Sequence, residues 1–300
     1  MNLLITGAWN ATEKDRAELE ELGYTISFLQ NERDELPCDP HVIDAVVCNG
    51  LFLHHPIGDF PNLKLIQLTS AGLDRVPLDT VRERGIKLYN AAGVYSIPLA
   101  EFALSGVLDL YKQKVAFRKS QAAHRWEKRR DLLELFGKRV LIVGCGSVGR
   151  ACAERFLSFG CHVSGVDIAP IDSPLFECVY PIERIEDALP TSDVVLLSLP
   201  LTKETEGLFD ARLFSLLKDG SVFVNLARGR LADVAALLDN IGRLRGAVLD
   251  VFPEEPLDPA SPLWDEEKVI LTPHNSFVSD GNAERLARLI YQNLKGFIGK

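Results

Sequence analysis

The stretch VLIVGCGSVGR, Val140 to Arg150, determines the fold expected of this chain. Its apolar first half is typical of a buried strand, and a helical pattern, ACAERFLSFG, follows it directly. Between them Gly144, Gly146 and Gly149 have the spacing G-x-G-x-x-G. The first glycine permits a tight turn, the second lets the backbone approach a pyrophosphate, and the third allows close helix–strand packing. The helix that follows offers free N–H groups and a positive dipole end to phosphates.

The next apolar run, CHVSGVD, ends in Asp167. A carboxylate there can accept hydrogen bonds from both adenine-ribose hydroxyls and would repel a 2′-phosphate. No Arg or Lys occurs in the three residues that follow, so the pattern predicts NAD over NADP, with Ser147 and Val148 also at the cofactor. Cys145 is expected to face the pyrophosphate, and it is not a nucleophile because no base accompanies it. A glycine turn without a nucleotide is the alternative.

Short apolar runs alternate with helical patterns along most of the chain, which predicts an α/β fold with parallel sheets and helices on both faces. A longer helical pattern, residues 97–115, separates two sets of runs, and the later set resembles a doubly wound dinucleotide domain. The early runs are residues 3–6, 24–29, 44–48, 63–68 and 86–89, and the later ones are 138–144, 161–167, 193–200, 220–227, 245–250 and 268–274.

Composition excludes several classes of protein. The 300 residues are 47% hydrophobic and 25% charged, as in ordinary globular domains, and a net charge of −9 argues against nucleic-acid binding. No apolar run is long enough for a membrane span, and MNLLITGAWN has no basic leader. Six cysteines without a C-x-x-C pair indicate reduced thiols and a cytoplasmic location. The adjacent His54 and His55 point apart in a strand, so no metal site is expected.

One locally basic segment, residues 111–130, departs from the overall acidity and carries Phe117 and Trp126. A nucleic-acid patch is one interpretation of it. A solvated helix or a subunit-contact arm is favoured, because the chain as a whole is acidic.

Three polar residues fall at strand exits, where open α/β sheets place their ligands. Arg228 follows the run GSVFVNLA, His274 closes KVILTPH, and Glu255 comes shortly after the run ending at Asp250. A guanidinium can grip a carboxylate, a histidine can exchange a proton, and a carboxylate beside it favours the imidazolium. Spacing alone does not separate Glu254 from Glu255, and each residue taken singly could be structural.

The segments GCGSVG, NLARGRLAD, DVFPEEP and TPHNS together resemble the D-isomer-specific 2-hydroxyacid dehydrogenase family, in order across about residues 90–280. The resemblance implies that Arg228 binds a substrate carboxylate and that Glu255, not Glu254, pairs with His274. It also places Asp250 at the nicotinamide amide and Pro200 at the nicotinamide side, and we expect Ala227 to contact the cofactor.

The early segment TSAGLD resembles the family's glycine loop, whose backbone N–H groups hold the substrate carboxylate, here at Ser70, Ala71 and Gly72. A plain turn at a strand exit is the alternative. The loop CNGLF lacks the Arg of phosphoglycerate-type members, which puts a phosphorylated substrate in doubt, although Arg75 could replace it.

The resemblance implies two domains: a Rossmann NAD-binding domain, residues 94–275, and a smaller flavodoxin-like substrate domain, residues 1–93 plus 276–300. The helix that begins near Ile97 and holds Glu101 matches the family's dimer-forming segment. The expected protein is an NAD-dependent oxidoreductase that interconverts a small D-2-hydroxy acid and its 2-oxo acid. An NAD(H)-sensing binding protein of the corepressor type is the second hypothesis.

Overall fold

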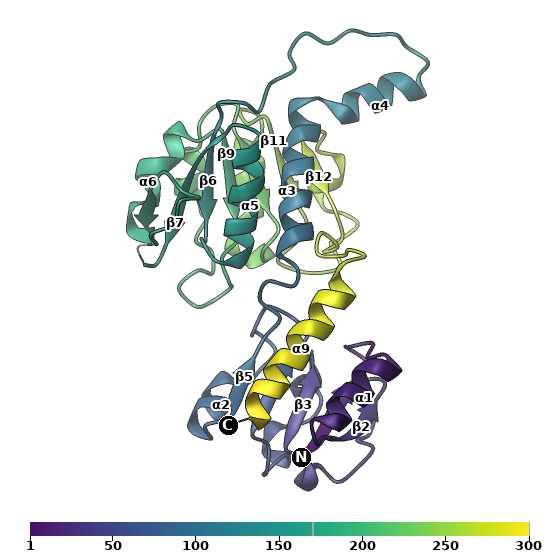
Figure 1. Cartoon of the computed structure of the whole chain (residues 1–300). Helices are drawn as coiled ribbons and strands as arrows, with labels where there is room; N and C mark the ends of the chain where they lie inside the picture. Colours follow the sequence, from purple (N-terminus) through teal and green to yellow (C-terminus); the bar gives the residue numbers. More distant parts are fainter. Residues whose placement is uncertain (170, 300) are drawn as a thin grey trace. The chain divides into compact units, whose positions relative to one another are not determined.

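The computed structural model describes residues 1–169 and 171–299, which divide into two compact units (Figure 1). The first unit holds Met1–Tyr95 and the C-terminal stretch from Ser279, and the second holds Ser96–Val278. Each unit is a parallel sheet with helices on its faces, which confirms the predicted α/β class.

The first unit contains a five-stranded sheet in the order β2-β1-β3-β4-β5, with every pair parallel. This is the flavodoxin-like order. All four residues of β3 and of β4 are buried, as in a strand covered on both faces. The strands are β1 Asn2–Thr6, β2 Thr25–Leu29, β3 Ala45–Cys48, β4 Leu65–Leu68 and β5 Lys87–Tyr89.

Helices cover both faces of this sheet. On one face α1 (Glu13–Glu21) lies beside α9 (Asn282–Ile298), and buried Leu19 and Ile290 share one core cluster (Figure 1). Gly23, at φ +93°, ends the α1 region as the sequence predicts. On the other face are α2 (Leu78–Glu83) and the short helices η1 Pro40–Val42, η2 Leu51–Leu53 and η3 Ile57–Asp59.

The second unit contains a seven-stranded parallel sheet in the order β12-β11-β10-β9-β6-β7-β8. The order reverses between β6 and β9, as in a doubly wound dinucleotide domain. The sequence predicts six of these strands and misses β8, a three-residue edge strand that ends in Pro181. The strands are β6 Arg139–Val143, β7 His162–Asp167, β8 Val179–Pro181, β9 Val194–Leu197, β10 Val222–Asn225, β11 Gly246–Leu249 and β12 Val269–Leu271.

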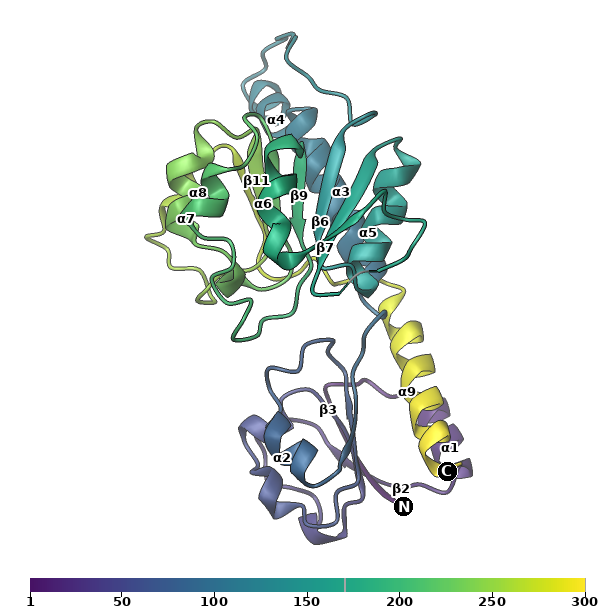
Figure 2. The same cartoon turned by 90° about the vertical axis from the view of Figure 1, so that its left-hand side faces the viewer.

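Two helical layers enclose this sheet (Figure 2). On one face α3 (Ser96–Tyr111) packs against α5 (Ser147–Ser158). The other face carries α6 Ile185–Ala188, α7 Ala211–Ser215 and α8 Val234–Ile241, with η4 Ile182–Arg184, η5 Leu189–Thr191, η6 Gly229–Leu231 and η7 Pro262–Asp265 in the connections.

The prediction of one long helix over residues 97–115 is wrong about where the helix ends. The chain leaves the helix after Tyr111, and α4 (Lys114–Ala122) begins as a separate element. Gln113 adopts a left-handed conformation, φ +50°, between the two helices, and this conformation interrupts a right-handed helix. Along residues 1–169 and 171–299, no helix combines the length and the apolar character needed to cross a membrane.

Candidate active site

The glycine turn lies at the topological switch point, between β6 and α5. Gly144 takes φ +101°, and a side chain at Gly149 would place a Cβ 2.0 Å from the Gly144 carbonyl oxygen. At Gly146 a Cβ would meet nothing within 4 Å, so this side of the turn is open. Gly146 is also the N-cap of α5 and has no side chain to occupy the helix's first N–H groups. The turn therefore leaves open space and helix N–H groups of the kind that bind phosphates.

Asp167 ends β7 and reaches the same turn. Its Oδ2 accepts the backbone N–H of Cys145 at 2.7 Å, and its Oδ1 accepts that of Ile168 at 2.8 Å. A carboxylate offers about four acceptor positions, so two remain for a ligand's hydroxyl groups. Ile168, the next residue, is 77% exposed.

Cys145 does not face outward, so the expectation that it faces the pyrophosphate is wrong. Its thiol is buried, and a Cβ built on Gly165 would lie 2.3 Å from its Sγ. Burial, and then the charge of Asp167, raises the pKa of Cys145 to about 12. The thiol therefore stays protonated at neutral pH and fills the space beside β7 that Gly165 leaves open.

The expected nicotinamide-side residues lie on two loops that hydrogen bonds hold in place. The Pro200 carbonyl accepts Thr205 Oγ1 at 2.7 Å, which closes the loop after β9. Ser198 Oγ donates to the Gly144 carbonyl at 2.6 Å and links this loop to the glycine turn. Ala227 follows β10, the next strand in the sheet. The expected cofactor residues therefore follow neighbouring strands.

Glu255 and His274 form a direct pair. His274 Nδ1 lies 2.8 Å from Glu255 Oε2, and the other carboxylate oxygen, Oε1, accepts the backbone N–H of Phe252 at 3.0 Å. The two side chains are 39% and 36% exposed, which leaves them accessible to a ligand. Spacing did not separate Glu254 from Glu255, and the geometry does: Glu255 is the residue that contacts His274.

Arg228 leaves β10 on a turn shaped by Asn225. The Asn225 side chain accepts the Ala227 N–H at 3.1 Å and donates to the Arg228 carbonyl at 2.9 Å. The next residue, Gly229, touches the backbone of Phe252, where a Cβ would lie 1.9 Å from the Phe252 carbonyl carbon. Glu255 accepts the N–H of the same Phe252. The backbone of Phe252 therefore connects the turn that carries Arg228 to the Glu255–His274 pair. The sequence analysis did not identify Asn225. The only sign of its role was an amide side chain at the end of an apolar run.

Asp250 lies beneath this pair and is 0% exposed. Its Oδ1 accepts Thr272 Oγ1 at 2.6 Å and the Asn275 N–H at 2.8 Å. Its Oδ2 accepts the Ser276 N–H at 3.0 Å and the Ser276 hydroxyl. Its carboxylate therefore holds both sides of the turn that carries His274.

In the first unit, Ser70, Ala71 and Gly72 follow β4 on an anchored loop. The Ser70 carbonyl accepts the Ala91 N–H at 2.9 Å, and the Ala71 carbonyl accepts Asn90 Nδ2 at 2.7 Å. In a trans peptide the N–H points opposite to the carbonyl. The N–H groups of Ala71 and Gly72 therefore point away from the residues that hold the loop.

Glu32 organises the neighbouring strand exits of this unit. Its carboxylate accepts Thr6 Oγ1 and the N–H groups of Asn49 and Gly50, each at 2.7 Å. The Thr69 N–H donates to the Cys48 carbonyl at 2.9 Å, so the loops after β3 and β4 begin side by side. Sequence reasoning missed Glu32 because it stands in the charged run NERDEL, where nothing distinguishes it from its neighbours.

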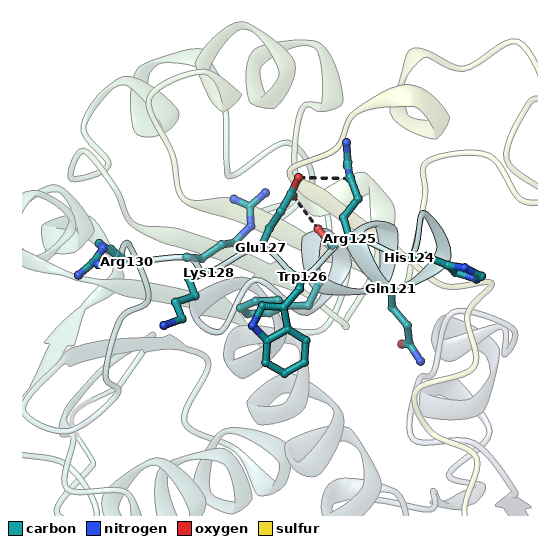
Figure 3. A pocket seen from close by; sticks show the side chains of 10 residues that line it. Gln121, His124, Arg125, Trp126, Glu127, Lys128 and Arg130 are labelled. Carbon is teal, nitrogen blue, oxygen red and sulfur yellow. Dashed lines mark hydrogen bonds and ion pairs between the residues drawn. The ribbon is translucent and has the colours of Figure 1, made fainter.

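A pocket of about 790 Å³ lies on α4 and the loop after it, where Trp126 is 95% exposed (Figure 3). Glu127 Oε1 lies 3.2 Å from Arg125 Nε, and Glu127 Oε2 accepts a hydrogen bond from Ser120 Oγ at 3.0 Å. This region follows the end of α3, whose Leu110 carbonyl accepts Arg245 Nε at 3.1 Å. Arg245 directly precedes β11, so the pocket lies toward the amino ends of the strands, away from the exits that carry Arg228, Glu255 and His274.

The open parallel sheet, the glycine turn at its switch point and Asp167 on the next strand define a dinucleotide-binding α/β protein. Residues 104–276 match the family model described as "D-isomer specific 2-hydroxyacid dehydrogenase, NAD binding domain". The chain belongs to the D-isomer specific 2-hydroxyacid dehydrogenase family, as the sequence motifs predict.

Individual relatives agree with this assignment. A D-3-phosphoglycerate dehydrogenase of Mycobacterium bovis is 38% identical over 219 residues, which are 71% of this chain and 41% of that protein. The chain therefore spans less than half the length of this relative. An (S)-sulfolactate dehydrogenase of Chromohalobacter salexigens is 32% identical over 245 residues, covering 80% of this chain and 79% of that protein.

A similar solved structure is a D-isomer specific 2-hydroxyacid dehydrogenase of Xanthobacter autotrophicus in complex with NADPH and MES. It has a TM-score of 0.80 and 26% identity, and the match covers 99% of this chain and 95% of that chain. The likeness extends over both units of the chain.

Proposed function

We propose that this protein is an NAD-dependent oxidoreductase that interconverts a small D-2-hydroxy acid and its 2-oxo acid. The observation that carries the proposal is the 2.8 Å contact between His274 Nδ1 and Glu255 Oε2, at the exits of neighbouring strands β11 and β12. A carboxylate-held imidazole at this edge of a dinucleotide-binding sheet is suited to proton transfer beside a bound nicotinamide.

His274 acts as the general acid and base. When bound, the cofactor supplies a hydride to the keto carbon or accepts one from the hydroxy acid. In the reducing direction the His274 imidazolium gives its Nε2 proton to the substrate oxygen, so the C=O π bond is replaced by new C–H and O–H bonds. Glu255 orients the ring through its contact with Nδ1.

Arg228 and the loop after β4 bind the substrate. A guanidinium can hold a carboxylate and the neighbouring oxygen with two parallel hydrogen bonds, which fixes the carbon to be reduced. Ser70, Ala71 and Gly72 are proposed separately as backbone donors to a substrate carboxylate. The anchored carbonyls of Ser70 and Ala71, which turn the next N–H groups outward, support this role.

The cofactor is bound as NAD rather than NADP. The two acceptor positions that Asp167 keeps would receive the ribose hydroxyls, and its charge would repel a 2′-phosphate. The residues proposed to contact the cofactor come from the glycine turn and three strand exits: Gly144, Gly146, Ser147, Val148, Gly149, Asp167, Pro200 and Ala227.

We further propose that the protein acts as a homodimer in the cytoplasm. The arm formed by α4 and the following loop exposes Trp126 almost completely, and a large aromatic side chain on such an arm is typical of a subunit contact. All six cysteines are free, as expected for a reducing compartment. Sedimentation analysis of the wild-type chain and of Trp126→Ala tests the dimer, which the substitution should weaken.

The decisive experiment follows NADH oxidation with a panel of 2-oxo acids that includes glyoxylate, hydroxypyruvate, pyruvate and bulkier acids. We expect turnover with at least one acid and faster turnover with NADH than with NADPH. Tight NADH binding without turnover across the panel would contradict the proposal and favour a nucleotide sensor. A preference for NADPH would overturn only the assignment of Asp167.

A further inference from the structure

Asp250 has no acceptor position left for a ligand. Four donors reach its carboxylate, two at each oxygen: Thr272 Oγ1 and the Asn275 N–H, and the N–H and hydroxyl of Ser276. A carboxylate offers about four lone-pair positions, so the protein itself uses all of them. The side chain is also 0% exposed.

These four donors surround one strained residue. His274 has φ +50°, a left-handed conformation that residues with a Cβ adopt only where their surroundings enforce it. Its backbone N–H donates to the Asp250 carbonyl at 2.7 Å, while the Asp250 side chain holds residues on both sides of it. Asp250 therefore binds the Thr272 side chain before this residue, the N–H of His274 itself and the Asn275 N–H after it.

We propose that Asp250 is a positioning residue that holds the turn at residues 272–276 and so aims His274 at Glu255, and that it does not receive the nicotinamide amide. The family resemblance assigns it the amide contact, but the saturated carboxylate has no position for that N–H donor. The catalytic consequence rests on the proposed function, whereas the effect on the His274 turn does not depend on it.

The first experiment uses Asp250→Asn without cofactor. Asparagine keeps the size, but its NH₂ group would face donors at one of the two oxygens, so the turn should open. NMR of the histidine ring N–H groups gives the readout, and the His274 Nδ1 signal is assigned by its loss in His274→Asn. We expect this signal to shift or broaden in Asp250→Asn. A signal at the wild-type position would overturn the proposal.

The second experiment uses a milder variant, so that the proposal can be tested even if Asp250→Asn does not fold. Ser276→Ala removes one of the four donors, and Ser192→Ala is its matched control, because Ser192 is also buried and donates to the Ala188 carbonyl at 2.8 Å. We expect Ser276→Ala to shift the His274 signal and Ser192→Ala to leave it unchanged. Equal shifts in both variants, or none in Ser276→Ala, would contradict the proposal.

Activity and binding then separate the two roles of Asp250. As a positioning residue it should affect kcat, by about tenfold in Ser276→Ala, while the NADH Kd stays within about threefold of wild type in both Ser276→Ala and Asp250→Asn. A nicotinamide contact predicts the reverse, a weaker NADH Kd with an unchanged His274 signal. Failure of the proposed function would remove turnover from the wild-type protein but would leave the NMR result intact.

Discussion

The two units use the same device at the exits of their strands, but for different purposes. Asp250 in the second unit and Glu32 in the first each bind neighbouring loops through a carboxylate, with four internal donors and three, respectively. The loop that Asp250 holds carries His274, whose backbone has a strained, left-handed conformation, whereas the loop that Glu32 holds carries Asn49 and Gly50. The first arrangement positions the His274 side chain beside Glu255, and the second fixes the backbone at Asn49 and Gly50.

The number of internal donors also separates structural carboxylates from those available to a ligand. Asp167 receives only two backbone N–H groups and keeps acceptor positions, while Asp250 is saturated. Substitutions of Asp250 should therefore change catalysis, and substitutions of Asp167 should change cofactor choice. Substitutions at Glu32 should mainly change stability.

The largest effect is expected from His274→Ala. Loss of general acid–base catalysis should lower kcat by about 10²- to 10⁴-fold, with an NADH Kd near wild type. Steady-state kinetics and a fluorescence titration measure the two quantities. His162→Ala is the matched control, since His162 Nδ1 also lies 2.5 Å from a glutamate oxygen, Glu177 Oε1. His162 is the first residue of β7, so it lies at the opposite end of the strand from the exits that carry the proposed site. Full turnover in His274→Ala would refute the acid–base role.

A smaller loss should follow from Arg228→Gln. Truncating one partner of a charge pair costs about 2–5 kcal/mol, so kcat/KM for the oxo acid should fall by about 30-fold or more. Cofactor affinity should change little, because the proposed ligand of the guanidinium is the substrate. Arg230→Gln provides the comparison, since Arg230 forms an exposed ion pair with Glu206. Equal losses in the two variants would remove the special role of Arg228.

Asp167→Ser tests the carboxylate that keeps its acceptor positions. Removing the charge should weaken NADH binding by about tenfold and shift cofactor preference toward NADPH. Titrations with both cofactors measure this, with Asp172→Ser, an exposed neighbour, as the control. If the NADH Kd of Asp167→Ser matched wild type, the carboxylate would serve the glycine turn alone.

Much of the architecture and the strand-exit positions could be predicted from the sequence, because both follow from local patterns. Apolar runs mark strands, and a glycine turn or a histidine directly after a run lies at the sheet edge whatever its tertiary contacts. Edge strand β8 was missed because three residues form no such pattern, and the break at Gln113 because nothing local demands a left-handed residue there.

The internal partners of the site could not be predicted, because they are distant in sequence. Glu32 reaches the Asn49 N–H across 17 residues, and Asp250 reaches the Ser276 N–H across 26. A carboxylate in a charged run gives no local sign of such a partner. The resemblance named Glu255 over Glu254 before any distance was known, whereas the saturation of Asp250 required the positions of its four donors.

The smallest effect on activity is expected from Glu32→Gln. Glutamine keeps the shape but replaces one acceptor oxygen by a donor, which would face either the Gly50 N–H or the Thr6 hydroxyl and the Asn49 N–H. Hydrogen bonds to a charged group are worth about 1.5–3 kcal/mol, so the free energy of unfolding from urea titrations should fall by about that amount. The NADH Kd should not change, because the proposed cofactor residues all belong to the second unit. Glu35→Gln, an exposed position in the same run, should leave stability unchanged. A large loss of kcat with wild-type stability would mean that the strand exits of the first unit direct chemistry as those of the second do.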